Sequence, residues 1–239
     1  MIKSITELGK SELYGKKVLL RVDFNVPVEN GKILGIYKIK AHKETVDYLI
    51  SNSAIITLLS HITAVESFEP LSGQIKVILG TENFSLQENV RKYKGEEDND
   101  EDFAKELAKS FDIYVNDAFS VSHRNHASIV AITKFLPSYA GLLLIKEIEN
   151  LDKIIKSPKE SKTLILGGAK INTKFPVIKN FLNKAENILI GGAIANVFLK
   201  AKGIDIKKSL TDDNFLEDAL EILKEKNLII PDDYVFLVI

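Results

Sequence analysis

The chain has 239 residues, of which 45% are hydrophobic and 27% are charged, a composition typical of a globular protein with one large or two small domains. Its 32 basic and 33 acidic residues leave a net charge of −1, so no overall field favours nucleic acid or an anionic membrane. The sequence contains no cysteine, which excludes disulfides and thiolate metal sites. The first residues lack the apolar core of a signal peptide, and no segment approaches the roughly 18 apolar residues of a membrane span, so we expect a soluble cytoplasmic protein.

Short, continuous apolar segments alternate with helical patterns along the chain. The predicted strands are, in chain order, 18–20, 54–59, 75–79, 111–115, 163–166, 188–190 and 234–239. Helical patterns cover 103–111, 142–155, 177–182 and 215–223. Apolar strands that alternate with helices predict an α/β fold with a mainly parallel sheet, buried on both faces. The polar segment 156–162 is the best linker candidate, so we expect one domain over residues 1–160 and another over 161–239.

An acidic segment, 96–102, lies just before the predicted helix that contains Phe103. We interpret it as a helix start, with an Asn or Asp cap and acidic residues favoured by the helix dipole, rather than as a metal site.

Polar residues follow the first two predicted strands. If the first strand continues, Arg21, Asp23 and Asn25 project from one face, because side chains alternate along a strand. Ligands of open α/β sheets bind at such strand ends, although a turn with local side-chain hydrogen bonds explains the same residues equally well. His61 follows the next predicted strand, and a lone histidine is more often structural than a ligand-binding residue. We expect His42, which lies in a helical stretch, at the surface.

A third cluster, 115–126, follows another predicted strand. Its histidines, His123 and His126, are three residues apart, but only Asp117 lies near as a third metal ligand. An anion-binding loop centred on Arg124 is the better interpretation.

Two further strands are each followed by a glycine pair, at 167–168 and 191–192. Glycines in this position let backbone amides approach a phosphate, and the N-terminus of the following helix adds positive potential. Lys170 and Lys174 have the i, i+4 spacing of one helix face. The spacing fits neither the Walker loop nor G-x-G-x-x-G. Two tight structural turns are the alternative, but the paired lysines favour phosphate binding.

Together these segments resemble the phosphoglycerate kinase family. The family motifs R-x-D-F-N-V-P, S-H, L-x-E-N-V-R, V-N-D-A-F, H-R-x-H-A-S, L-G-G-A-K and G-G with A-x-x-F-L-K occur in the same order. They are residues 21–27, 60–61, 86–91, 115–119, 123–128, 166–170, and 191–192 with 195–200. The resemblance covers nearly the whole chain, and several of the motifs are long and specific.

The resemblance implies two doubly wound domains with parallel sheets, joined by a hinge, of which the second is incomplete here. In the family the N-terminal domain binds 3-phosphoglycerate or 1,3-bisphosphoglycerate, and the C-terminal domain binds ADP or ATP with Mg²⁺. The acyl phosphate is transferred to ADP in glycolysis. We therefore expect Mg²⁺ only through the nucleotide phosphates, no metal held by protein side chains alone, and a monomer without nucleic-acid or membrane partners.

The resemblance also assigns roles to residues. Asp23 and Asn25 are expected to orient the glycerate, His61 and Arg124 to bind its charged ends, and Arg21 to support the strand end. On the nucleotide side, backbone approach is expected at Gly168, Gly191 and Gly192. Charge on the transferring phosphate is expected to be neutralised by Lys170 and Lys174, which with Lys38 form the expected catalytic set. We expect these two groups to face each other across a gap.

The sequence departs from the family at its arginines. Lys38 stands at the position of a substrate arginine, which keeps the charge but loses the bidentate fork. Ala64 and Glu160 stand at two further arginine positions, and Ala193 replaces the third glycine of a G-G-G turn.

The chain is also short for the family. The stretch from His61 to Asn89 is predicted to lack about one strand-and-helix unit. The sequence ends in an apolar pattern before the G-G-G-D-T loop, so we expect an incomplete product with little or no catalysis. The alternative function is a catalytically silent anion-binding or interaction module. A weaker alternative is a generic α/β domain whose glycine turns are purely structural.

Overall fold

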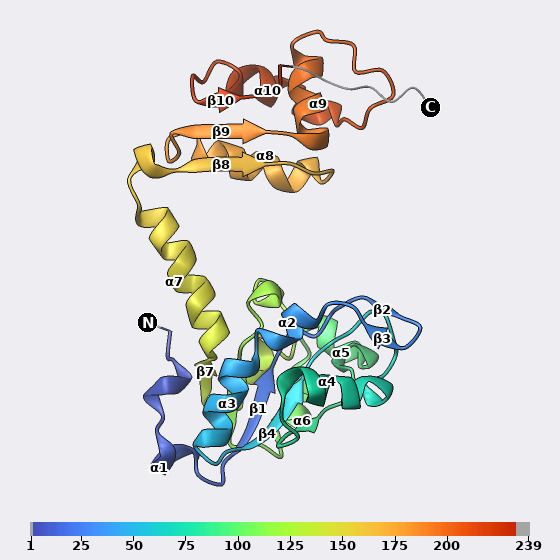
Figure 1. The fold of residues 1–239 in the computed structure, drawn as a ribbon, viewed down its shortest axis with the longest axis vertical. Coiled ribbons are helices and arrows are strands. Elements are labelled where there is room, and N and C mark those ends of the chain that lie inside the picture. Colours follow the sequence, from blue (N-terminus) through green and yellow to red (C-terminus); the bar gives the residue numbers. More distant parts are fainter. Residues whose placement is uncertain (1, 233–239) are drawn as a thin grey trace. The chain divides into compact units, whose positions relative to one another are not determined.

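The computed structural model describes residues 2–232 and shows two compact units, Met1–Asn150 and Leu151–Ile239. Each unit is built on its own parallel sheet with helices, so the predicted α/β class is confirmed (Figure 1). The boundary between the units falls inside helix α7 (Leu142–Lys156), at residue 150 instead of the expected 160. The predicted linker 156–162 contains the end of α7 and a 3₁₀ helix, Lys159–Ser161.

The first unit contains a five-stranded parallel sheet in the order β5-β4-β1-β6-β7. Its strands are β1 (Lys17–Arg21), β4 (Ile55–Leu59), β5 (Ser85–Leu86), β6 (Ile113–Asn116) and β7 (Ser138–Ala140). The predictions for 18–20, 54–59 and 111–115 are confirmed by β1, β4 and β6. A small antiparallel hairpin, β2 (Val28–Glu29) and β3 (Lys32–Ile33), lies outside this sheet.

The helices of the first unit before α7 are α1 (Lys10–Leu13), α2 (Ile36–Lys40), α3 (Lys43–Ser51), α4 (Ser72–Leu79), α5 (Lys94–Glu97) and α6 (Glu101–Ala108). Short 3₁₀ helices lie at Ile5–Glu7, Glu69–Leu71, Val90–Lys92, Phe119–Val121 and Ala131–Lys134. The predicted start of the helix at Phe103 is confirmed, because the side chain of Asp100 accepts a hydrogen bond from the Phe103 amide at 2.7 Å.

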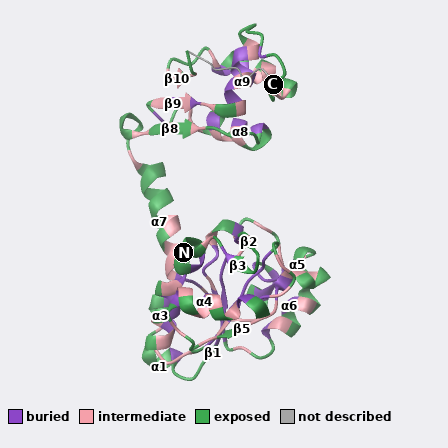
Figure 2. Cartoon of the chain, turned by 45° about the vertical axis from the view of Figure 1, so that its right-hand side comes forward, coloured by how far each residue is buried: buried purple, intermediate pink, exposed green. Residues whose placement is uncertain are grey.

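The central strand, β1, is buried on both faces of the sheet. Val18 and Leu20 pack in one apolar cluster with residues of α3 and α4, whereas Leu19 packs in another with residues of α6. Figure 2 shows the buried residues concentrated around this sheet. Full burial of such side chains contributes about 1.5–3 kcal/mol each, so both helical layers stabilise the strand whose end carries the site.

The predicted strand 75–79 is wrong, because these residues form the C-terminal part of α4. Ile75 and Leu79 are buried on one helix face, whereas Val77, which would share their face in a strand, is 81% exposed. The helix ends at Gly80, whose φ of 68° is the left-handed cap that glycine adopts most easily. The β-branched residues therefore gave a misleading propensity that tertiary packing overrides.

The second unit contains a three-stranded parallel sheet in the order β10-β9-β8. Its elements are β8 (Thr163–Leu166), α8 (Ile171–Phe181), β9 (Asn187–Ile190), α9 (Gly192–Ala201), a 3₁₀ helix (Asp213–Phe215), α10 (Leu216–Ile222) and β10 (Leu228–Ile229). The strands predicted at 163–166 and 188–190 are confirmed. The strand predicted at 234–239 lies outside the described residues.

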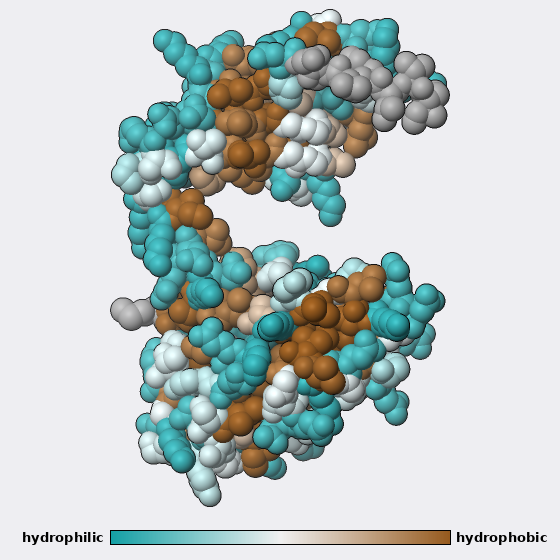
Figure 3. Space-filling model, in the orientation of Figure 1, coloured by the Kyte–Doolittle hydropathy of each residue, from teal (hydrophilic) through white to brown (hydrophobic). Residues whose placement is uncertain are grey.

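Aromatic stacking forms part of the core of the second unit. The ring of Phe175 on α8 lies 5.3 Å from that of Phe198 on α9 and 4.7 Å from that of Phe215. Strand β8 is not buried on both faces, as was expected for a parallel strand, because Ile165 is 74% exposed. Figure 3 shows hydrophobic residues gathered over β8 and β9.

No helix in residues 2–232 is long and apolar enough to cross a lipid bilayer.

The helical assignment of 72–79 predicts unequal effects of two substitutions. Leu79→Ala should lower the free energy of unfolding by about 2–5 kcal/mol, because it leaves a cavity under α4. Val77→Ala should change it by less than about 0.5 kcal/mol, because that side chain is exposed. Urea unfolding followed by circular dichroism measures both values. Equal losses for the two variants would contradict the helix.

Candidate functional site

The carboxyl ends of the three central strands lie at one level of the sheet. Arg21, the last residue of β1, is in register with Leu59 at the end of β4 and with Asn116 at the end of β6. The loops that follow these strands are therefore neighbours at one edge, as predicted for strand ends in an open α/β sheet. β1 itself ends at Arg21, so the strand alternation expected to place Asn25 continues no further.

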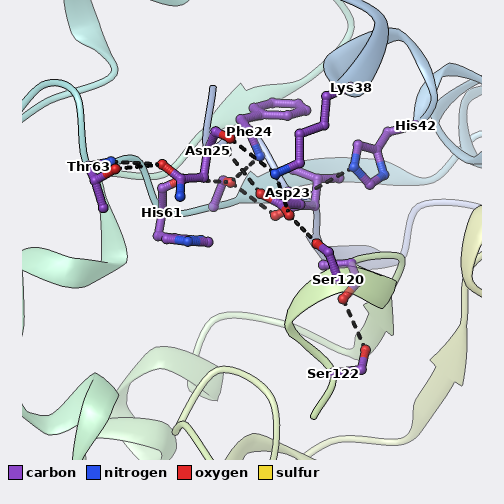
Figure 4. A network of polar contacts seen from close by, with 12 residues as sticks. Asp23, Phe24, Asn25, Lys38, His42, His61, Thr63, Ser120 and Ser122 are labelled. Carbon is purple, nitrogen blue, oxygen red and sulfur yellow. Dashed lines mark hydrogen bonds and ion pairs between the residues drawn. The ribbon is translucent and has the colours of Figure 1, made fainter. Parts of the chain in front are cut away.

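Asp23 lies at the centre of this edge and is almost fully buried. Its Oδ2 is 2.8 Å from Lys38 Nζ and accepts a hydrogen bond from the Ser120 hydroxyl, while Oδ1 accepts one from the Asn25 amide at 3.0 Å (Figure 4). Burial pushes the pKa of Asp23 upward, but the hydrogen bonds from Lys38 and Ser120 outweigh it and lower the pKa below its ordinary value. The side chain is therefore a carboxylate at neutral pH.

Lys38 is bound to the site by two contacts. Besides Asp23, its Nζ donates to the Asn25 carbonyl at 3.0 Å, although 42% of the side chain remains exposed. The charge of this lysine is thus already paired with a carboxylate. An anionic ligand has to share it with Asp23.

Asn25 is oriented by a residue of the loop after β4. Its Oδ1 accepts hydrogen bonds from the backbone amide of Thr63 at 3.0 Å and from the Thr63 hydroxyl at 2.9 Å. Because the amide oxygen is occupied, the Nδ2 group is the one left to contact a ligand, and no acceptor for it lies among the described residues.

His61 is held by the buried side chain of Arg21. The Nη2 atom of Arg21 lies 3.2 Å from Nδ1 of His61, and both residues are only 1% exposed. A guanidinium can only donate, so Nδ1 accepts and the imidazole carries its proton on Nε2. Burial, together with the charge of Arg21, lowers the pKa of His61 to about 3. At neutral pH His61 is therefore a neutral hydrogen-bond donor and not a cation.

Arg124 lies on the loop after β6 and is half-buried. Its charge helps to lower the pKa values of His61 and His126, after the larger effect of burial in each case, which places it near both rings. In the described chain its guanidinium has no hydrogen-bond partner, so it is available to an anion. His123 is exposed, and residues 2–232 contain no group of three His, Asp or Glu side chains that could hold a metal ion.

The prediction that His42 lies at the surface is wrong. His42 is 1% exposed, its Nε2 accepts a hydrogen bond from the Asp23 amide at 3.0 Å, and its Nδ1 lies 2.7 Å from Asp117 Oδ2. The backbone amide can only donate, so the ring proton is on Nδ1 and is donated to Asp117. His42 directly precedes α3. The sequence around it contains no pattern that shows whether its side chain points into the protein or toward solvent.

Asp117 connects three elements through one buried carboxylate. Its Oδ1 accepts hydrogen bonds from the Thr45 hydroxyl of α3 at 2.9 Å and from the Leu143 amide in the first turn of α7 at 3.0 Å. A carboxylate at this position satisfies an amide that α7 leaves unpaired. A Cβ at Gly141 would lie 2.1 Å from the same Oδ1, so only glycine fits there.

A cavity of about 190 Å³ adjoins these side chains. It is lined by Asp23, Lys38, Ala41, His42, Asp117, Ala118, Phe119, Ser120, Leu143 and Glu147. A larger cavity, of about 640 Å³, lies beside α6 and contains none of the polar residues described above. We place the site at the sheet edge beside the smaller cavity, because Asp23, Lys38 and Ser120 line it, whereas Asn25, His61 and Arg124 lie outside its lining.

In the second unit, the two predicted glycine turns pack directly on each other. Gly168 has a φ of 107° and Gly192 a φ of 59°, and a Cβ at Gly192 would lie 2.8 Å from the Gly168 nitrogen. Close packing thus requires a glycine at 192, whereas the Cβ position at Gly168 faces open space. Gly191 donates its amide to the Leu166 carbonyl at 2.8 Å.

Lys170 and Lys174 differ in their relation to α8. Lys170 has a ψ of 79° and precedes the helix, whereas Lys174 lies in its first turn. The predicted i, i+4 helical pair is therefore wrong. Both lysines remain near the N-terminus of α8, beside the first glycine turn. That they face the residues of the first unit across a gap stays a prediction.

The family model of phosphoglycerate kinase matches residues 8–78 and 76–238 of the chain. The chain belongs to the phosphoglycerate kinase family. It is 39% identical to the phosphoglycerate kinase of Dictyoglomus turgidum over 98% of this chain and 67% of that protein. It is also 39% identical to that of Bartonella bacilliformis, over 95% of this chain and 66% of that protein. The chain spans about two thirds of the length of these relatives.

Solved structures agree with this assignment. The structure of phosphoglycerate kinase from Coxiella burnetii matches with a TM-score of 0.82 and 32% identity, covering 97% of this chain and 66% of that one. The enzyme from Pyrococcus horikoshii matches with a TM-score of 0.84 and 26% identity, over 96% and 67%.

The match to the family model is divided at residues 76–78, within the stretch predicted to be short. The alignment with the Dictyoglomus protein has 266 positions, more than the 239 residues of this chain, so that relative contains residues that this chain lacks.

The buried position of His42 predicts a large stability effect. His42→Ala should lower the free energy of unfolding by about 2–5 kcal/mol, because it leaves the Asp23 amide and the Asp117 carboxylate without a partner. His123→Ala is the matched control and should change it by less than about 0.5 kcal/mol. Urea unfolding at pH 7 tests this, and an equally mild effect of both substitutions would contradict the described role of His42.

The lowered pKa of His61 predicts a pH dependence of stability. Between pH 6.5 and about 3 the unfolded chain binds a proton on this histidine that the folded chain does not, so stability falls as the pH decreases through this window. The slope from one proton reaches about 1.4 kcal/mol per pH unit. Urea unfolding at pH 7 and pH 5 should therefore show a smaller loss for His61→Gln than for the parent chain or for His123→Gln. The same loss in all three proteins would show that His61 is not protected from protonation.

Proposed function

We propose that the chain acts in the phosphoglycerate kinase reaction of glycolysis, in which the acyl phosphate of 1,3-bisphosphoglycerate is transferred to ADP. The first unit holds 1,3-bisphosphoglycerate or 3-phosphoglycerate, and the second unit holds the nucleotide. The observation that carries this proposal is the convergence of Asp23, Asn25 and His61 at one sheet edge in a member of this family. Phosphoryl transfer needs positioning and charge stabilisation rather than a covalent nucleophile, which suits these residues.

Each side chain has a role that its protonation state permits. The Asp23 carboxylate accepts a hydrogen bond from the glycerate hydroxyl group. The amide group of Asn25 and the Nε2–H of His61 are neutral donors for ligand oxygens. Arg124, which is free of protein partners among the described residues, supplies the positive charge for an anionic end of the ligand.

The nucleotide phosphates are bound by the second unit in this proposal. Lys170 and Lys174 provide positive charge, and the turns at Gly168, Gly191 and Gly192 let the backbone come close. Mg²⁺ would be held through the oxygens of the bound nucleotide phosphates, where it would neutralise part of their charge. We also propose a cytoplasmic monomer without nucleic-acid or membrane partners, in keeping with the net charge of −1.

Turnover is expected to be low. Lys38 is paired with Asp23, and where the family motif has arginine Ala64 supplies no charge and Glu160 supplies a negative one. The surplus of positive charge around the ligand is thus small compared with the charge of a phosphorylated glycerate. The pairing of Lys38 favours a second candidate function, a catalytically silent module that binds an anion without transferring phosphate.

A coupled assay of ATP formation from 1,3-bisphosphoglycerate and ADP tests the proposal. We expect slow ATP formation. The rate should fall about tenfold or more in Lys174→Ala, because the positive charge that neutralises the transferring phosphate is lost. Lys184→Ala, which removes an exposed lysine of the same unit, should leave the rate unchanged.

Calorimetric titration with 3-phosphoglycerate separates the two candidate functions. Arg124→Ala should weaken binding about tenfold or more, whereas Lys109→Ala, on the surface beyond α6, should not. Binding without turnover would favour the silent module. If the parent chain shows neither binding nor turnover, the proposed function is wrong.

A further inference from the structure

Four buried polar side chains form a continuous chain of hydrogen bonds that ends at the site. The Ser128 hydroxyl lies 2.6 Å from Glu96 Oε1, Arg21 Nε lies 3.0 Å from the same hydroxyl, and Arg21 Nη2 lies 3.2 Å from His61 Nδ1. All four residues are at most 1% exposed. They come from four separate segments: α5, the end of β1, and the loops after β4 and β6.

The directions of these hydrogen bonds follow from Arg21. Its guanidinium has only donors, so both the Ser128 oxygen and His61 Nδ1 must accept from it. The hydroxyl proton of Ser128 is then free to be donated to Glu96, which as a carboxylate accepts it. The position of each proton in this hydrogen-bond network is therefore fixed, and the ring proton of His61 lies on Nε2.

Glu96 also fixes Ser128 through the backbone. Its second oxygen, Oε2, accepts the Ser128 amide at 2.8 Å, and the Ser128 carbonyl accepts the Tyr114 hydroxyl at 2.6 Å. Glu96 also places a negative charge near the buried guanidinium of Arg21, to which it is connected through the Ser128 hydroxyl. The acidic segment 96–102, interpreted from the sequence as a helix start with acidic residues favoured by the helix dipole, contains one residue that lies fully inside the protein.

The other side of the His61 ring is open to a ligand. Among the described residues, Nε2 of His61 has no hydrogen-bond partner. It does not belong to the buried polar atoms that lack a partner, so it is accessible to solvent. Figure 4 shows the ring close to Asn25 and Asp23. The charged groups that act on the ring are Arg21, Asp23, Arg91 and Arg124.

We propose that Glu96 is a positioning residue for the site: through Ser128 and Arg21 it holds His61 as the Nε2–H tautomer, which presents one neutral donor to an anionic ligand. The ligand class rests on the proposed function, but the tautomer is a property of the free protein. A donor in a fixed direction favours an oxygen of a carboxylate or phosphate, whereas a rotating cation would attract any anion.

Nuclear magnetic resonance of the histidine ring nitrogens tests the tautomer in the ligand-free chain. The parent protein should show His61 as the Nε2–H form from pH 7 down to about pH 5. A His61 that carries its proton on Nδ1, or that gains a second ring proton within this pH range, would overturn the proposal without any variant.

Two substitutions then test Glu96 itself. Glu96→Gln replaces the carboxylate by an amide. The new amide group either turns its NH₂ toward the Ser128 amide or binds the Ser128 hydroxyl without a negative charge. Ser128→Ala removes the oxygen that accepts the hydrogen bond of Arg21 Nε. Both should give a mixture of His61 tautomers and should weaken 3-phosphoglycerate binding by about tenfold. Glu101→Gln, which removes an exposed carboxylate, is the control and should change neither.

Retained Nε2–H signals in a folded Ser128→Ala or Glu96→Gln chain would overturn the role of Glu96. If only Ser128→Ala folds, its spectrum alone decides, because it breaks the same chain of hydrogen bonds. Failure of the parent chain to bind 3-phosphoglycerate would count against the proposed function, whereas the tautomer measurement would still stand.

Discussion

The first unit is organised around a guanidinium that has almost no contact with water. Removal of an arginine from water is costly unless its donors find acceptors, and Arg21 has four acceptors: Ser128, His61 and the carbonyls of Val22 and Leu59. These acceptors lie at the end of β4 or in the segments that follow β1, β4 and β6. Satisfying one side chain therefore fixes the loops in which the candidate ligand-binding residues lie.

Charges at the site are compensated in pairs. Asp23 is paired with Lys38, and Arg21 has Glu96 nearby, so Arg124 is the main charge left for a ligand in the described part of the first unit. Such pairing keeps the carboxylate ionised and the loops ordered, but it leaves only a weak attraction for a highly charged anion. This pairing of charges is the electrostatic reason why we expect any activity to be weak.

The sequence predicted those parts of the fold that depend on local patterns. The apolar strands and the polar residues after them are visible in the sequence, and the register of a parallel sheet brings their ends together. The helix at 72–79 was missed because Ile75 and its neighbours favour strands locally, while burial follows the helical period. The roles of His42 and Glu96 could not be predicted, because their partners are far away in sequence and hydrogen-bond direction has no local signature. Asp117 was visible at its strand end, but only the structure shows that its oxygens are fully used inside the protein.

The contact between Asp117 and Gly141 has a consequence for how this sequence can diverge. The carboxylate occupies the volume that any larger residue at 141 would need, and the same carboxylate is needed by α3, by α7 and by His42. A side chain at 141 could therefore be accommodated only after the acid had been shortened or lost, and that first change would itself remove the hydrogen bonds from His42, Thr45 and the α7 amides. Positions 117 and 141, which are 24 residues apart, are therefore expected to change together, because a substitution at either one alone gives a destabilised protein.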